Sequence, residues 1–197
     1  MGSKSILLII SGPAGSGKNT VAERLMSAFP SSIERVITST SRPPRGQEKD
    51  GLDYHFLSKE EFEKGIARGD FYEYAKVHDR YYGTSKSAVR KAWENDKDLI
   101  LIIDVQGAKT WKKIAESDGE LAQRMLRVFI APASIAELRE RLAGRGTESQ
   151  SEIDRRMLTA ESELKSADEF DARINSTTRE ADFEALKNIY LAKKASI

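Results

Sequence analysis

The sequence predicts an α/β fold organised around a parallel β-sheet. Two continuous apolar runs, Ile6–Ile10 and Leu99–Ile103, are typical of parallel strands that are buried on both faces. Stretches in which apolar residues recur at helical spacing separate such runs, and this alternation of strands with helices favours a parallel sheet. A length of 197 residues fits one domain, or one domain that carries an insertion.

The expected elements follow one another from the first strand onward. A Gly-rich turn follows the strand at Ile6–Ile10, and a helix over 19–29 comes next and ends at Pro30. Val36 and Ile37 indicate a short second strand. Later strands are expected at 99–103, 125–130 and 172–175, and later helices at 108–115, 134–142, 151–164 and 180–192.

The segment from about 40 to 94 breaks this alternation. It is rich in Gly, Pro and aromatic residues, and its short extended pieces predict a small sheet with one helix over 59–67. We expect this segment to be an insertion placed over the main sheet, so that 1–39 and 95–197 form the core. Five of the six tyrosines lie in the insertion: Tyr54, Tyr72, Tyr74, Tyr81 and Tyr82.

Composition excludes several classes of protein. The 32 basic and 31 acidic residues leave a net charge of +1, which argues against a bulk nucleic-acid binder and against an acidic disordered tail. The absence of cysteine excludes disulfides, cysteine metal ligands and cysteine nucleophiles, and it fits a reducing compartment. The longest apolar runs are too short to cross a bilayer. We therefore expect a soluble cytoplasmic protein with neither nucleic acid nor membrane as a partner.

A phosphate-binding motif follows the first strand. Residues Gly12 to Lys18 match G-x-x-x-x-G-K between a buried strand and a helix, where backbone N–H groups and the helix N-terminus bind phosphate and Lys18 reaches the β- and γ-phosphates of ATP. The alternative, an ordinary Gly-rich turn, is disfavoured by this context. The predicted ATP-binding residues here are Gly12, Pro13, Ala14, Gly15, Ser16, Gly17, Lys18, Asn19 and Thr20.

One residue departs from the motif. Asn19 stands where Ser or Thr would supply a hydroxyl to magnesium, and Thr20 comes next. Asn19 can offer an amide oxygen, or the ion is held by phosphates and water alone. We predict magnesium as the cofactor, bound with ATP and held mainly by its phosphates and water.

Two arginines downstream form a second candidate anion site. Arg42 and Arg45 are three residues apart and are stiffened by Pro43 and Pro44, so they can form a fixed fork on a second phosphate. A second anion site near a P-loop predicts a kinase with a phosphorylated acceptor. The alternative is that both arginines only solvate a loop.

At this point the sequence resembles the guanylate kinase family, from about Ser5 to Tyr190. The resemblance implies a three-layer α/β/α P-loop core, an inserted small mixed-sheet GMP-binding region and a helical lid at about 134–160. It also implies ATP and GMP as substrates. Beyond the P-loop, the matching motifs are Ser-Arg-Pro-Pro-Arg at 41–45, Gly-Leu-Asp-Tyr-His-Phe at 51–56, Phe-Tyr-Glu at 71–73, Tyr-Tyr-Gly-Thr at 81–84, Ile-Asp-Val-Gln-Gly at 103–107, Phe-Ile-Ala-Pro at 129–132 and Arg-Leu-Ala-Gly-Arg-Gly-Thr-Glu at 141–148.

The family's GMP-binding roles carry over where residues match. By resemblance, Glu73 and Thr84 read guanine: a carboxylate accepts from N1–H and the exocyclic amine, and a hydroxyl can donate to O6. Thr38 stands where the family usually has Ser. The predicted GMP-binding residues are Thr38, Arg42, Arg45, Tyr54, Glu73, Tyr82, Thr84 and Asp104, of which Arg42, Arg45, Tyr54 and Tyr82 would hold the phosphate.

The resemblance also implies the catalytic residues. Asp104 ends an apolar run where P-loop enzymes keep an acidic residue near magnesium, although the family's second acidic residue is replaced by Ile102. The alternative for Asp104 is a structural cap. Asn175 matches the adenine-side position. The predicted catalytic residues are Lys18, Arg42, Asp104, Arg141, Arg145 and Arg156, whose cationic members would stabilise the charge of the transferred phosphoryl group.

The predicted function is ATP-dependent phosphorylation of GMP to GDP in purine nucleotide metabolism. The alternative is a catalytically inactive guanylate-kinase-like module that binds proteins. Such modules typically lose the P-loop lysine and other phosphate-binding residues, whereas Lys18, Arg42, Arg45, Arg141 and Arg145 are all present here.

Overall fold

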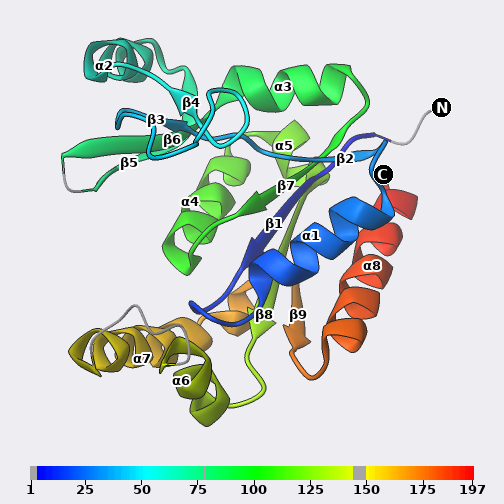
Figure 1. Ribbon diagram of the computed structural model, residues 1–197. Helices are drawn as coiled ribbons and strands as arrows, with labels where there is room; N and C mark the ends of the chain where they lie inside the picture. Colours follow the sequence, from blue (N-terminus) through cyan, green and yellow to red (C-terminus); the bar gives the residue numbers. More distant parts are fainter. Residues whose placement is uncertain (1–3, 78, 144–149) are drawn as a thin grey trace.

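The computed structural model describes residues 4–77, 79–143 and 150–197 and has a five-stranded parallel sheet at its centre (Figure 1). The strands lie in the order β2-β7-β1-β8-β9, so the first strand occupies the middle. In register, Ile9 pairs with Leu101 on one side and with Arg127 on the other. The strands are β1 (Leu7–Ser11), β2 (Ile33–Arg35), β7 (Asp98–Ile102), β8 (Met125–Ala131) and β9 (Ala172–Asn175).

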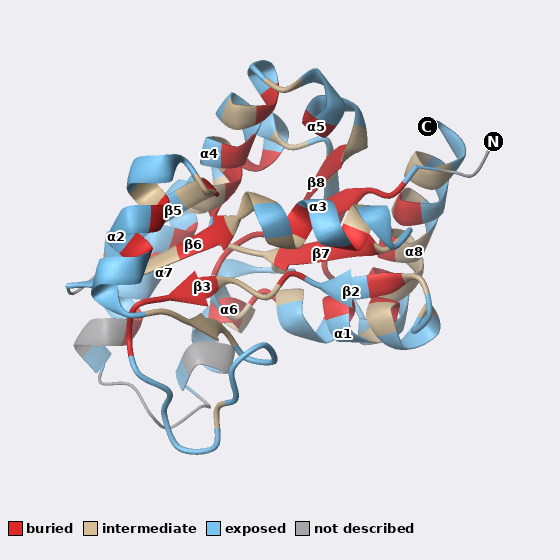
Figure 2. Ribbon diagram, turned by 90° about the horizontal axis from the view of Figure 1, so that it is seen from above, coloured by how far each residue is buried: buried red, intermediate tan, exposed pale blue. Residues whose placement is uncertain are grey.

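Helices cover both faces of this sheet and produce three layers. Because successive side chains of a strand point to opposite faces, Leu8 of β1 packs with Leu25 of the first helix, whereas Leu7 packs with Trp111 on the other face. The buried residues concentrate along the sheet (Figure 2). On the first face lie α1 (Lys18–Ala28) and α8 (Arg179–Ala195), and on the second α3 (Lys86–Glu94), α4 (Val105–Glu116) and α5 (Gly119–Arg124).

A second, smaller sheet stands apart from the first. Its order is β4-β3-β6-β5, with β3 and β4 parallel and the other pairs antiparallel. The helix of this region begins at a capping box, in which Ser58 and Glu61 satisfy each other's backbone N–H groups. Phe62 of that helix stacks on Phe71 at 4.4 Å. The elements are β3 (Ser39–Thr40), β4 (His55–Phe56), α2 (Lys59–Arg68), β5 (Phe71–Val77) and β6 (Arg80–Ser85).

Two further helices lie on the same side of the central sheet as the small sheet. These are α6 (Ile135–Ala143) and α7 (Gln150–Leu164), drawn below the small sheet at the left of Figure 1. Leu138 of α6 and Met157 of α7 are buried against each other. The carboxyl ends of the central strands therefore face the region between the small sheet and the helix pair α6–α7. Open α/β sheets bind ligands at this end of their strands.

The α/β class, the parallel central sheet and the small mixed sheet agree with prediction, but some element bounds were wrong. The short second strand lies at Ile33–Arg35 and not at Val36 and Ile37. Beyond Arg35, Val36 adds only one backbone hydrogen bond, from its N to Ile100 O at 2.9 Å. Helices α3 and α5 and strands β3 and β6 were not predicted. Buried Val89 of α3 packs with the core, so the division at 40 and 94 stays a prediction.

Candidate active site

The Gly-rich turn between β1 and α1 has the backbone conformation of a phosphate cradle. Gly12, Gly15 and Gly17 have φ values of 138°, 88° and 96°, which side-chain-bearing residues rarely adopt. At Gly12 a Cβ would lie 2.3 Å from the carbonyl oxygen of Ile130, so no larger residue fits there. The motif's glycines are therefore required by local geometry, as the sequence predicted for an anion nest.

Two polar side chains of the cradle, Lys18 and Ser16, lie against the turn. Lys18 Nζ donates to the carbonyl oxygens of Gly12 at 2.6 Å and Pro13 at 2.8 Å. The hydroxyl of Ser16 is fully buried and has no hydrogen-bond partner among the described residues. Since buried hydroxyls are normally paired, this hydroxyl fits a site that receives an oxygen-bearing ligand.

A cavity of about 550 Å³ adjoins the cradle. Its second wall is the turn between β9 and α8, where Asp182 accepts from Ser176 Oγ at 2.6 Å and from the backbone N of Thr177 at 2.9 Å. Asn175 is not among its lining residues, and its side chain instead accepts from Arg173 Nε at 2.8 Å. The lining residues are Ala14, Gly15, Gly17, Lys18, Asn19, Thr20, Val21, Ser176, Thr177, Arg179 and Asp182.

The described residues contain no cluster of three or more His, Asp or Glu side chains able to hold a metal ion. Asn19 and Thr20, at the start of α1, are exposed at the mouth of the same cavity. One amide oxygen and one hydroxyl suit an ion that keeps most of its water and phosphate ligands, as magnesium does. This donor set fits the expectation that phosphates and water hold the magnesium.

The predicted phosphate clamp is assembled on the small sheet. Arg42 is buried and lies 4.9 Å above the ring of Tyr54, which meets the ring of Tyr82 edge-on at 6.2 Å. The pKa of Arg42 is raised, chiefly by hydrogen bonds from its guanidinium to Glu48 and also by an interaction with Tyr82. The structure thus brings three of the four predicted phosphate ligands together. Arg45 is exposed beside them.

The predicted guanine readers face each other across neighbouring strands. Glu73 of β5 pairs in register with Thr84 of β6, and Thr84 Oγ1 donates to Glu73 Oε1 at 2.8 Å. Burial raises the pKa of the Glu73 carboxyl above its usual range. Thr38 lies half-buried before β3, and its carbonyl oxygen accepts from the backbone N of His55 at 2.9 Å. In this state the Thr84 proton is directed at Glu73, so donation to guanine O6 requires the hydroxyl to rotate.

Asp104 lies between the two binding regions. It caps α4 by accepting from the backbone N of Gly107 at 2.7 Å, which is the structural role named above as the alternative. Burial raises the pKa of Glu73 and of Glu163, and the charge of Asp104 raises both further. The charge of Lys18 acts on Glu163 in the opposite direction. Asp104 is therefore close enough to act electrostatically on both the guanine readers and the P-loop side.

The predicted arginines of the lid are only partly described. Arg141 lies on α6, although its side chain is outside the described part of the chain, and Arg145 lies outside the described residues altogether. Arg156 is exposed on α7. Arg139 of α6 pairs with Asp154 of α7 at 2.8 Å and so joins the two helices.

Several residues near the site were missed from sequence. Glu48 was given no role, and neither were Asp182 and Glu163, which lie within two of the predicted helices. The signal for Asp182 is its place in the first turn of a helix after a Ser-Thr-Thr turn, a pattern typical of side-chain caps. Glu48 has no comparable local signal, because it meets Arg42 across an irregular loop. Glu163 has none because the charges that act on it, Lys18 and Asp104, lie on other elements.

These features define the chain as a P-loop nucleotide-binding α/β protein with a second cluster of basic and aromatic residues on its small sheet. The family model described as guanylate kinase matches residues 4–193, and the chain belongs to the guanylate kinase family. It is 42% identical to a guanylate kinase of Hydrogenovibrio crunogenus, covering 95% of this chain and 88% of the relative. It is 45% identical to one of Porphyromonas gingivalis, covering 85% and 86%.

A solved structure agrees with this assignment. The crystal structure of guanylate kinase from Anaplasma phagocytophilum matches with a TM-score of 0.69 and 26% sequence identity, covering 98% of this chain and 87% of that one. The fold prediction of a parallel-sheet core with an inserted small sheet is therefore confirmed. Among the described residues, no helix combines the length and apolar character that a membrane crossing requires.

Proposed function

We propose that this enzyme transfers the γ-phosphoryl group of magnesium-bound ATP to GMP and releases ADP and GDP. As a guanylate kinase the chain phosphorylates GMP to GDP; the identity of the donor and the roles of individual residues are the proposal. The observation that carries it is the pairing of a P-loop cradle with a buried arginine–tyrosine cluster on the small sheet. Two phosphate-binding regions suit a donor and a phosphorylated acceptor.

The chemistry needs no side-chain nucleophile. A phosphate oxygen of GMP attacks the γ-phosphorus of ATP, and the bond from that phosphorus to the β,γ-bridging oxygen breaks, so that the electron pair leaves with ADP. Because negative charge spreads over the transferred oxygens, catalysis consists of positioning and cationic stabilisation. We assign that stabilisation to Lys18, Arg42, Arg141, Arg145 and Arg156.

Guanine selection follows from the Glu73–Thr84 pair. The ionised carboxylate accepts two hydrogen bonds, and guanine offers two donors, N1–H and the exocyclic amine, on one edge. In the structure Thr84 already supplies one donor to that carboxylate. Adenine presents a different edge, so it would leave these buried groups unpaired, which is a strong basis for discrimination.

Magnesium would be held by the triphosphate and water, with Asn19 and Thr20 as the nearest exposed protein oxygens of the cradle. When bound, the ion neutralises charge on the β- and γ-phosphates. Asp104, which follows β7 and caps α4, is the acidic residue assigned to the metal's neighbourhood. We place the reaction in cytoplasmic purine nucleotide metabolism, since a chain without cysteine fits a reducing compartment.

The direct test is a coupled assay that measures ADP release from ATP with GMP, AMP, CMP or UMP as acceptor. Turnover with GMP in clear excess over the others is expected. Glu73→Gln should weaken GMP binding by about 1–3 kcal/mol without a matching loss for ATP. Glu60→Gln, at an exposed carboxylate on α2 of the same region, is the control and should change neither. Absence of GMP-dependent turnover, with neither nucleotide bound in calorimetry, would favour an interaction module.

A further inference from the structure

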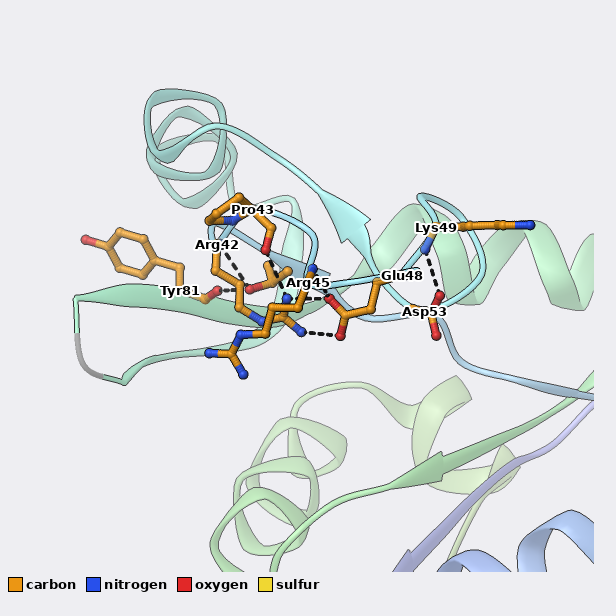
Figure 3. Close-up of polar contacts among 8 residues, drawn as sticks. Arg42, Pro43, Arg45, Glu48, Lys49, Asp53 and Tyr81 are labelled. Carbon is orange, nitrogen blue, oxygen red and sulfur yellow. Dashed lines mark hydrogen bonds and ion pairs between the residues drawn. The ribbon is translucent and has the colours of Figure 1, made fainter.

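A carboxylate outside the predicted site holds the central arginine of the clamp. Glu48 Oε2 accepts from Arg42 Nη1 at 2.6 Å, and Glu48 Oε1 accepts from Nη2 at 2.7 Å (Figure 3). Glu48 Oε2 also accepts from the backbone N of Arg45 at 2.8 Å. One carboxylate therefore fixes the guanidinium of the first arginine and the backbone of the second.

Burial explains why Arg42 requires this partner. Its side chain is only 6% exposed and is enclosed by the rings of Tyr54 at 4.9 Å and Phe56 at 5.7 Å. A buried guanidinium without a counter-charge is strongly unfavourable. Before an acceptor phosphate arrives, Glu48 supplies that counter-charge, and it remains ionised because the Arg42 hydrogen bonds hold its pKa at about 2.

The backbone that carries Arg42 is fixed as well. The backbone N of Arg42 donates to Thr40 Oγ1 at 3.3 Å, and that hydroxyl donates to Tyr81 O of β6 at 3.0 Å. The neighbouring Ser41 donates from its backbone N to Tyr81 O at 3.0 Å and accepts from Tyr81 N at 2.8 Å. Because the backbone is held by β6, the orientation of the Arg42 guanidinium depends on the groups bonded to its two Nη atoms. Glu48 accepts from both of these atoms.

The donors left on Arg42 indicate how a phosphate would be bound. A guanidinium has five N–H donors in two forks, one end-on and one side-on. Glu48 takes the end-on fork, and Pro43 O accepts from Nη1 at 3.0 Å. The side-on fork consists of Nε–H and the second hydrogen of Nη2, and neither is used by Glu48; Tyr82, itself a predicted phosphate ligand, also interacts with the guanidinium. A phosphate that approaches this edge can bind two N–H groups while the ion pair stays intact.

We propose that Glu48 is a positioning residue for GMP, which holds Arg42 and Arg45 as one preformed clamp and presents the side-on fork of Arg42 to the acceptor phosphate. This inference rests on the proposed function. Glu48 touches no substrate in this proposal; it acts through the two arginines. Its loss should therefore affect recognition of the phosphate and leave recognition of the base and of ATP unchanged.

The test compares three variants in steady-state kinetics with ATP and GMP. Glu48→Gln should raise the KM for GMP by about 10- to 100-fold, because a charge-assisted pair to a buried arginine is lost. The KM for ATP and the inhibition by guanosine, which lacks the phosphate, should not change. Glu48→Asp keeps the charge but is one methylene too short to reach both arginines, so its effect should be intermediate.

The matched control is Asp53→Asn. Asp53 lies in the same loop and its carboxylate also accepts from a backbone N, that of Lys49 at 2.8 Å (Figure 3). The described structure shows it paired with no arginine. This variant should keep the KM for GMP of the parent enzyme. Thermal unfolding of all variants, together with the KM for ATP, reports whether the fold is retained.

Two results would overturn the proposal. If Glu48→Gln bound GMP as tightly as the parent enzyme or more tightly, Glu48 would compete with the phosphate for Arg42 and would not position it. If Glu48→Gln weakened GMP and guanosine equally, Glu48 would only maintain the loop. Failure of the proposed function is seen separately, since the parent enzyme itself would then show no GMP-dependent turnover.

Discussion

Asp182 supports one wall of the cavity beside the P-loop, where we propose that ATP binds, so changing it should weaken ATP binding selectively. This carboxylate is 9% exposed and lies in the first turn of α8. It accepts from Ser176 Oγ at 2.6 Å and from Thr177 N at 2.9 Å, and both of these residues line the cavity next to the P-loop. Asp182→Ala removes both acceptors, whereas Asp182→Asn keeps the shape and loses the charge.

The two hydrogen bonds set the size of the effect. In Asp182→Ala the Ser176 hydroxyl and the Thr177 amide both lose a charged partner, each worth about 1–3 kcal/mol. Thr177 is exposed, so water can replace part of its lost hydrogen bond. We therefore expect Asp182→Ala to cost about 2–4 kcal/mol of interaction free energy in total. The Asn amide can still accept from Thr177, and its loss should be roughly half of that. If about 1.4 kcal/mol of this cost appears as lost binding free energy, the affinity for ATP falls tenfold.

The assay is calorimetric titration with ATP and with GMP, accompanied by urea unfolding. We expect ATP binding to be weaker in both variants, more so in Asp182→Ala than in Asp182→Asn. GMP binding should be unchanged. Glu184→Gln is the matched control, since Glu184 lies on the same helix and pairs with Lys187 at 3.2 Å on its surface. A loss of stability in Asp182→Ala with equal or no change in the two affinities would refute the assignment.

Two further predictions concern the core and a third concerns the P-loop. Asp98→Ala removes an acceptor shared by three donors, among them Tyr190 OH at 2.6 Å and Lys194 Nζ at 2.9 Å. It should lower the free energy of unfolding in urea by about 3–5 kcal/mol. A loss below about 1 kcal/mol would contradict this prediction. Burial and Asp98 raise the pKa of Tyr190, so the neutral phenol is favoured by folding, and stability should be lost as pH rises above 10.0 in the parent enzyme but less in Tyr190→Phe. Gly12→Ala, whose Cβ would lie 2.3 Å from Ile130 O, should lower the melting temperature and weaken ATP binding.

The parts of the molecule that sequence predicts well are those whose determinants are contiguous. The P-loop is specified by eight neighbouring residues between a strand and a helix, Ser11 to Lys18, and the structure shows the positive φ values that its glycines require. The strands β1, β7 and β8 are long apolar runs, and each lies within one residue of its predicted bounds, whereas the short strand β2 does not lie where it was predicted. The α/β class, the family and the GMP-phosphorylating activity are confirmed, and the roles of the individual site residues stay predictions.

The missed parts depend on tertiary partners. β3 has two residues, Ser39 and Thr40, and is a strand only because β4 and β6 lie on either side of it. The part of Asp182 in the cavity wall was missed, because it holds the turn at Ser176 from the following helix; the adenine-side role of Asn175 stays a prediction. Glu48 meets Arg42 six residues away through an irregular loop, a spacing that no helical or strand period would indicate.

The central position of β1 has a consequence for biosynthesis. Leu7–Ser11 is made first, but its neighbours in the sheet are β7 and β8, and β8 ends at Ala131. At about 5–20 residues per second, this apolar strand waits roughly 5–25 s for its second partner. Both backbone edges of β1 lack their final partners until β7 is made, and one edge lacks its partner until β8 is made; unpaired apolar edges promote aggregation. Early packing of β1 against α1, through contacts such as that of Leu8 with Leu25, would cover one face of the strand while the rest of the chain is synthesised.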